Sequence, residues 1–122
     1  MSRDERIAAR LVAAMDSLMP PSCTTSISGG RLAVAIDGTP DVSIDLAVGE
    51  GMPDRDAALA FNVLSTIQDV IIRTSTRPWP PGGDQTALPY PEAAVRQGQL
   101  VAWFGEEAHP AMAIPPIDLA TV

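Results

Sequence analysis

Three residue types are scarce in this sequence, and each scarcity argues against a class of functional site. The 122 residues include no lysine, one cysteine and one histidine. A single cysteine cannot form an internal disulfide, and one cysteine with one histidine cannot supply the usual tetrahedral zinc shell. Without lysine the chain cannot contain the phosphate-binding loop that ends in Gly-Lys-Ser/Thr. We therefore expect no metal and no cofactor.

Positive charge is also in short supply. Eight arginines, scattered along the chain, are outnumbered by 15 acidic residues, which gives a formal net charge of −7. Duplex-binding proteins need a basic patch to neutralise phosphates, and anionic membranes attract clusters of basic residues. The chain also lacks an apolar run of about 20 residues and the continuous apolar segment of a signal peptide. We expect a cytoplasmic protein that binds neither nucleic acid nor membranes.

The use of arginine in place of lysine, together with abundant alanine, is typical of GC-rich bacterial genomes. The chain is nevertheless rich in core-forming residues, since 46% of it is hydrophobic. That share is too high for a disordered chain, and the length fits one ordinary domain. The sequence therefore predicts a single globular domain over residues 1–122 of a bacterial protein.

The first element that the sequence predicts is a helix over residues 3–18. Ser2 and Glu5 fit a capping box, in which each satisfies a backbone N–H at the start of a helix. Proline has no N–H and disfavours a helical residue before it, so Pro20-Pro21 ends the helix. Four apolar residues, separated by four, four and three positions, form one stripe of this helix: Ile7, Leu11, Met15 and Leu18.

A β-hairpin is predicted next, around the turn residues 37–41. Apolar and small residues alternate before the turn at 32–36 and after it at 42–48, and Asp-Gly is a strong hairpin signal. One face carries branched apolar side chains and is expected in the core. The other face is small, so another sheet or helix could approach it closely: Ala33, Ala35, Ser43, Asp45 and Ala47.

Residues 55–74 predict a long central helix, with Asp54 as its N-cap. Apolar residues cover more than half of its circumference, which indicates burial on more than one side. Only a narrow polar side remains, and it includes Gln68. A proline-rich connection is predicted over 75–98, followed by a strand at 99–104 and a short strand at 111–114 that Pro115-Pro116 ends.

These elements predict an α+β fold, a two-layer sandwich of αββαββ order. In it, one four-stranded antiparallel sheet carries two helices on one face. The helix–hairpin order occurs twice, and Gly30 and Pro40 recur at Gly98 and Pro110, with offsets of 68 and 70 residues. Residue identity between the halves is otherwise low, so both a duplication and independently similar hairpins stay open.

No catalytic constellation rises above background. His109 lies in a predicted turn, Cys23 has no signature of a nucleophile around it, and Asp37, Asp41 and Asp45 lack the spacing of a calcium loop. Turn, strand and incidental roles explain these residues more simply. We expect no catalytic residue, and we favour a protein that is not an enzyme.

Binding residues are better candidates, and they cluster in and after the proline-rich connection. Aromatic residues and arginine are enriched at interface hot spots. Trp79 either packs back on the core and anchors the connection, or shares an exposed patch with Tyr90. Arg77 and Arg96 could meet an anionic group on a ligand. Partner or ligand binding is therefore assigned to four residues: Arg77, Trp79, Tyr90 and Arg96.

Two functions remain open on this evidence. The first is a non-enzymatic protein-interaction or chaperone-like module that acts as a homodimer, because symmetric pairing is the commonest assembly and the small-residue face offers a contact surface. Some small acidic two-layer proteins of bacterial secretion systems have a similar plan, although fold does not fix function. The alternative is a small-ligand-binding domain with a pocket between helix 55–74 and the sheet.

Overall fold

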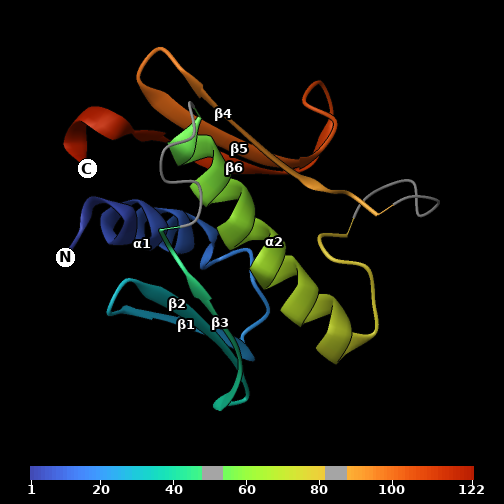
Figure 1. The fold of residues 1–122 in the computed structure, drawn as a ribbon. Coiled ribbons are helices and arrows are strands. Elements are labelled where there is room, and N and C mark those ends of the chain that lie inside the picture. Colours follow the sequence, from blue (N-terminus) through green and yellow to red (C-terminus); the bar gives the residue numbers. More distant parts are fainter. Residues whose placement is uncertain (48–53, 82–87) are drawn as a thin grey trace.

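The chain forms two successive units, each a helix followed by three antiparallel strands. A computed structural model describes residues 1–47, 54–81 and 88–122. Sheet A has the order β1-β2-β3 and sheet B the order β4-β5-β6, and the long helix α2 lies between the two sheets (Figure 1). The shorter helix α1 lies beside α2 (Figure 1). The core is therefore built around α2 rather than on one face of a single sheet.

Helix α1 spans Arg3–Met15 and begins as predicted. The Ser2 hydroxyl accepts from the Glu5 N–H at 3.2 Å, and the Glu5 carboxylate accepts from the Ser2 N–H at 3.0 Å. Ile7, Leu11 and Met15 are fully buried, which confirms the apolar stripe. The helix ends three residues earlier than expected, and Leu18 lies beyond it with an exposed side chain.

Sheet A consists of β1 (Cys23–Ser28), β2 (Arg31–Ile36) and β3 (Thr39–Asp45). The predicted hairpin is its β2–β3 pair. Asp37 and Gly38 both have positive φ, at 52° and 81°, as a two-residue turn of the hairpin type requires. The strand after the turn was expected to extend to Val48, which lies outside the described residues.

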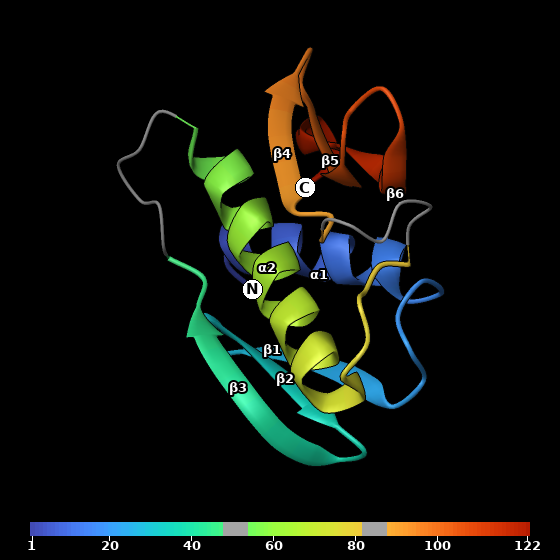
Figure 2. The same cartoon turned by 90° about the vertical axis from the view of Figure 1, so that its right-hand side faces the viewer.

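Helix α2 spans Arg55–Ser75 and confirms the predicted central helix. Figure 2 shows α2 between sheet A and sheet B, and its buried residues belong to one core cluster with residues of both sheets. Asp54 occupies the N-cap position, but its side chain accepts no capping hydrogen bond. Thr76 ends the helix in the left-handed conformation, with φ of 55°.

Sheet B consists of β4 (Pro91–Arg96), β5 (Gln99–Gly105) and β6 (Pro110–Asp118), and the 3₁₀-helix η1 (Leu119–Thr121) follows it. The predicted strand at 99–104 is β5. The prediction that Pro115-Pro116 ends the last strand was wrong, because β6 continues to Asp118. Proline is tolerated there because β6 is an edge strand and needs no N–H on its outer side.

The predicted fold class was wrong in strand number and in sheet arrangement. The order is α1, β1–β3, α2, β4–β6, with two separate three-stranded sheets instead of one four-stranded sheet. Two strands had been missed. β1 is mostly threonine and serine and gives little apolar alternation, while β4 lies within residues 75–98, which had been interpreted as a proline-rich connection. Residues 82–87 of that connection lie outside the described part.

The apolar circumference of α2 explains why there are two sheets. A helix that is apolar on more than half of its surface cannot be covered by one sheet. Val63, Leu64 and Ile67 are completely buried along it. Sheet A contributes Leu32 and Val34 to the same core as Leu100 and Phe104 of sheet B. One hydrophobic core thus connects both units.

Candidate interaction surface

The segment that follows α2 directs Trp79 into the core. Trp79 is 7% exposed, and its ring meets Phe104 edge to face, with centroids 5.4 Å apart and planes at 74°. This geometry suits the quadrupoles of two aromatic rings. It confirms the interpretation in which Trp79 packs on the core and anchors the connection. Arg77, two residues earlier, has an exposed side chain.

Gln68 of α2 holds both ends of the proline-rich connection. Its side chain is 3% exposed, and the amide nitrogen donates to the Trp79 carbonyl at 3.0 Å and to the Pro89 carbonyl at 2.6 Å. One amide has two donor hydrogens, so both bonds form together. In the sequence, Gln68 stands out only as part of the narrow polar side of the helix. Its position at the margin of a wide apolar stripe could have indicated this role, because a polar side chain that is buried there needs a hydrogen-bond partner inside the protein.

Tyr90 and Trp79 do not share an exposed patch. The Tyr90 side chain is 67% exposed, whereas Trp79 faces the interior. The Tyr90 carbonyl accepts from the Gly105 N–H at 2.9 Å, which aligns the start of β4 against the end of β5. The backbone of Tyr90 therefore helps to pair β4 with β5, while its phenol ring is exposed to solvent.

Arg96 lies across the outer face of sheet B. Its guanidinium forms a bidentate ion pair with Glu107, with one N–O distance of 3.0 Å, and sits 5.7 Å from the centre of the Trp103 ring. The hydrogen bond to Glu107 raises the pKa of Arg96 and lowers that of Glu107. The Trp103 indole nitrogen is buried and meets no acceptor within the described ranges.

The structure separates the four predicted binding residues. Trp79 is in the core, Arg77 follows the end of α2, Tyr90 precedes β4, and Arg96 ends β4 with its charge already paired. Their assignment as a binding set stays a prediction. The small-residue face of sheet A is partly occupied as well, because the Arg31 guanidinium donates to the Ser43 hydroxyl at 3.0 Å.

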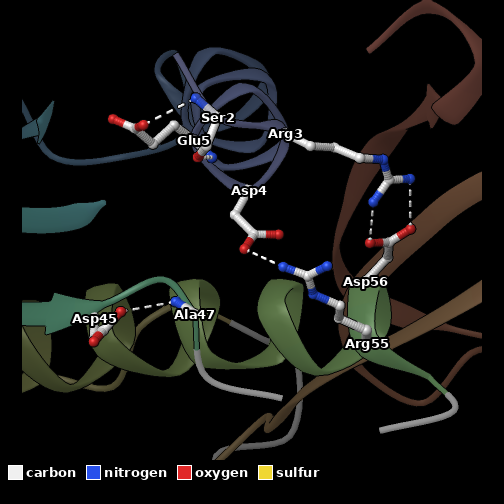
Figure 3. Close-up of polar contacts among 8 residues, drawn as sticks. All are labelled: Ser2, Arg3, Asp4, Glu5, Asp45, Ala47, Arg55 and Asp56. Carbon is white, nitrogen blue, oxygen red and sulfur yellow. Dashed lines mark hydrogen bonds and ion pairs between the residues drawn. The ribbon is translucent and has the colours of Figure 1, made fainter. Parts of the chain in front are cut away.

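A cluster of charges joins the N-terminal ends of the two helices (Figure 3). Arg3 of α1 donates to both oxygens of Asp56 of α2, at 2.7 and 2.9 Å. In the opposite direction, Arg55 of α2 donates to Asp4 of α1 at 2.5 Å. Asp4 is 9% exposed, and its second oxygen has no hydrogen-bond partner in the part of the chain that the structure describes.

The electrostatics of this cluster favour a structural role. The hydrogen bond from Arg3 lowers the pKa of Asp56, and the same contact raises the pKa of Arg3. Both arginines that could receive an anionic ligand are thus already neutralised by aspartates of the other helix. The cluster connects α1 to α2 and fixes how the two units meet.

Apolar side chains are exposed where α2 lies beside β4. Phe61 of α2 is 45% exposed and Val95 of β4 is 43% exposed. Phe61 precedes Gln68 by seven residues, which is two helical turns, so both lie on the flank of α2 from which Gln68 contacts Pro89, two residues before β4. β4 forms one edge of sheet B and, within the described residues, pairs with β5 alone. We call Phe61, Val95 and the free edge of β4 the α2–β4 surface.

Hollows of different sizes lie near α2 in the described part of the chain, and an open one of about 430 Å³ at its N-terminal end is lined by Val95 and by charged residues that include Arg55 and Asp56. One hollow of about 130 Å³ lies between the C-terminal end of α2 and sheet A, lined by residues that include Ile36, Ile71 and Thr74. Pockets for drug-sized ligands are larger, about 300–1,000 Å³. A more open groove of about 450 Å³ runs between α1 and β1, lined by residues that include Ala9, Val12 and Ile27. Polar side chains line both hollows, with Asp16 and Ser26 in the larger groove and Asp37 and Ser75 in the smaller hollow.

Cys23 and His109, the two residues weighed for catalysis, lie in different units of the fold. Cys23 starts β1 and is buried, and burial raises the pKa of its thiol, which lowers its reactivity. His109 lies in the turn between β5 and β6, where its backbone N–H donates to the Glu106 carbonyl at 3.2 Å. Across residues 1–47, 54–81 and 88–122, no three His, Cys, Asp or Glu side chains are grouped as metal ligands would be.

Comparison of the chain with protein-family models, with curated proteins and with solved structures found no match. Neither helix of the described part is both long and apolar enough to cross a membrane. The surface of the protein itself is therefore the guide to function, and the α2–β4 surface combines two exposed apolar side chains with an edge strand.

Proposed function

We propose that this protein is a non-enzymatic interaction module, chaperone-like in binding other protein surfaces, and that it acts as a homodimer. The observation that carries this proposal is the α2–β4 surface. Phe61 and Val95 are each more than 40% exposed beside a strand edge. Apolar side chains next to unpaired backbone groups are costly in water and are typical of surfaces that bind another chain.

The outer face of sheet B supports the same reading. Trp103 lies there under the guanidinium of Arg96, and tryptophan with arginine is the combination most enriched at interface hot spots. This face adjoins the edge of β4 and extends the proposed contact region.

The mass of the protein in solution tests the homodimer. Sedimentation equilibrium of the full chain should give about twice 12.8 kDa. Phe61→Ser should shift the equilibrium toward monomer, because it removes exposed apolar area that pairing would cover. Leu18→Ser is the matched control, since Leu18 is also an exposed apolar residue but lies after α1. A monomeric wild-type protein at all accessible concentrations would contradict the proposal.

A further inference from the structure

The two edges of sheet B differ in their ability to pair with another strand. β6 contains Pro110, Pro115 and Pro116, which lack the N–H that a strand partner needs. β4 has only Pro91, at its first position, so its later N–H groups are available. Of these two edges, β4 is the one open to another strand.

The backbone groups on the free edge of β4 can be identified from its pairing with β5. The Gly105 N–H donates to the Tyr90 carbonyl, and these residues are opposite in the β4–β5 register, so they form a hydrogen-bonded pair. Such pairs alternate along an antiparallel ladder. Glu92, Ala94 and Arg96 therefore direct their backbone groups toward β5. Ala93 and Val95 direct theirs outward.

We propose that the β4 edge pairs with the β4 edge of a second copy of this chain, antiparallel and centred on Ala94. In this register Ala93 of one protomer is opposite Val95 of its partner, and Val95 is opposite the partner's Ala93. The N–H and C=O groups of these two residues are those that the free edge presents. The inference rests on the proposed homodimer and specifies its interface.

Charge complementarity argues for a second copy as the occupant. In the same register, Glu92 of each protomer lies opposite Arg96 of the other, on the outer face of the joined sheet. Opposite charges directly across a strand pair stabilise it, and like charges destabilise it. Arg96 already binds Glu107, but a guanidinium has five N–H donors and can also donate hydrogen bonds to a second carboxylate.

The inner face of the joined sheet is complementary as well. Ala93 and Val95 lie on the face that packs toward α2, because their partners Ala102 and Leu100 are buried. Pairing places the 43% exposed Val95 against the small Ala93 of the other copy. The strand Glu92-Ala93-Ala94-Val95-Arg96 thus meets its own reverse with opposite charges at its ends and small apolar residues between.

A charge-swap experiment tests this register. Glu92→Arg leaves two arginines on the edge, and Arg96→Glu leaves two glutamates. Each variant alone places like charges opposite each other twice, so its dimer should dissociate roughly tenfold or more easily than that of the wild type. Mixing the two variants restores both opposite-charge pairs. The mixture should form a heterodimer in sedimentation equilibrium.

Disulfide trapping provides a second test. In the proposed register Ala94 faces its own copy in a non-hydrogen-bonded pair, where Cα atoms are about 4.5 Å apart, within disulfide range. Ala94→Cys in a Cys23→Ala background should form a covalent dimer under mild oxidation. Ala113→Cys in the same background, at an exposed position on β6, is the matched control and should remain largely monomeric on a non-reducing gel.

The outcomes separate this inference from the proposed function. A wild-type monomer would overturn both. A wild-type dimer whose single charge variants dimerise normally, or whose mixed variants show no gain, would overturn β4 pairing while the homodimer stands. The same holds if Ala94→Cys and Ala113→Cys cross-link equally. Monomeric single variants that associate on mixing, with selective trapping at position 94, support the register.

Discussion

The two units of the molecule share a plan but bury their surfaces differently. Each has a helix followed by three antiparallel strands, and the second residue of each middle strand, Leu32 or Leu100, is buried. Yet α1 buries one stripe over 13 residues, whereas α2 buries two sides over 21 residues. Turn residues and alternation therefore set the plan of a unit, while the apolar circumference of its helix sets how much of that helix the core covers.

The outer faces of the sheets differ as much as the helices do. Sheet A presents serine, threonine and alanine to solvent, with Arg31 bound to Ser43 across them. Sheet B presents Val101 and Trp103, with Arg96 above the indole ring. Large apolar side chains give more contact area than small polar ones. The second unit is therefore the one that we assign to binding.

The largest expected effect tests whether the units share one core. Leu32→Ala and Leu100→Ala remove matched, fully buried side chains from the two middle strands. Each should lower the free energy of unfolding by about 2–5 kcal/mol, from lost burial and the cavity left behind. Urea unfolding followed by circular dichroism should show one cooperative transition for both variants. Separate transitions, with only one shifted in each variant, would mean that the units fold independently.

A smaller effect on stability is expected from replacing Gln68, because its two hydrogen bonds lie within the second unit. Gln68→Leu keeps the volume but leaves the Trp79 and Pro89 carbonyls without their donor. The loss in unfolding free energy should be about 2 kcal/mol, because unsatisfied buried acceptors are destabilising. Asn62→Leu, on the same helix but only half-buried, is the control for adding leucine to α2. Unchanged stability in Gln68→Leu would show that the two bonds contribute nothing.

The smallest effect concerns the ion pair that links the units. Asp56→Asn should cost about 1 kcal/mol at neutral pH, since the bidentate contact with Arg3 is only partly shielded. The folded-state pKa of Asp56 is lowered by Arg3, so its contribution is present above the unfolded pKa of about 3.9 and is lost as pH falls through the lower folded value.

Urea midpoints measured from pH 7 to pH 2 should reveal this dependence. Wild-type and Asp56→Asn proteins should differ near neutrality and converge in acid. Asp69→Asn provides the control, because it is the same substitution at an exposed position of α2. A constant difference across the range would remove the ion pair as its cause.

Sequence patterns predicted the elements with strong local signals. The Ser2–Glu5 capping box, the apolar stripe of α1, the Asp37-Gly38 hairpin and the long central helix all depend on neighbouring residues, and all are present. β1 and β4 were missed. Their stability comes from pairing with β2 and β5 rather than from their own apolar alternation, so a local pattern carries little trace of them.

The candidate binding surface likewise depends on contacts between distant segments, which local sequence patterns do not show. The sequence singled out Trp79, Tyr90 and Arg96 as aromatic and basic residues near a proline-rich connection, and the structure places them apart. Neither Phe61 nor Val95 was singled out as a binding residue. Their exposure depends on where α2 ends up relative to β4, which no local spacing encodes.

The sequence by itself determined where helices start, where hairpins turn and that one helix is apolar on most of its surface. Those features depend on capping, positive φ and side-chain period, which act within a few residues. Among the described residues, only the tertiary structure decided that six strands form two sheets, that the charged N-terminal ends of the helices pair, and that β4 pairs with β5 alone. These outcomes depend on packing between residues far apart in the chain, because burial and hydrogen-bond satisfaction are settled over the whole molecule.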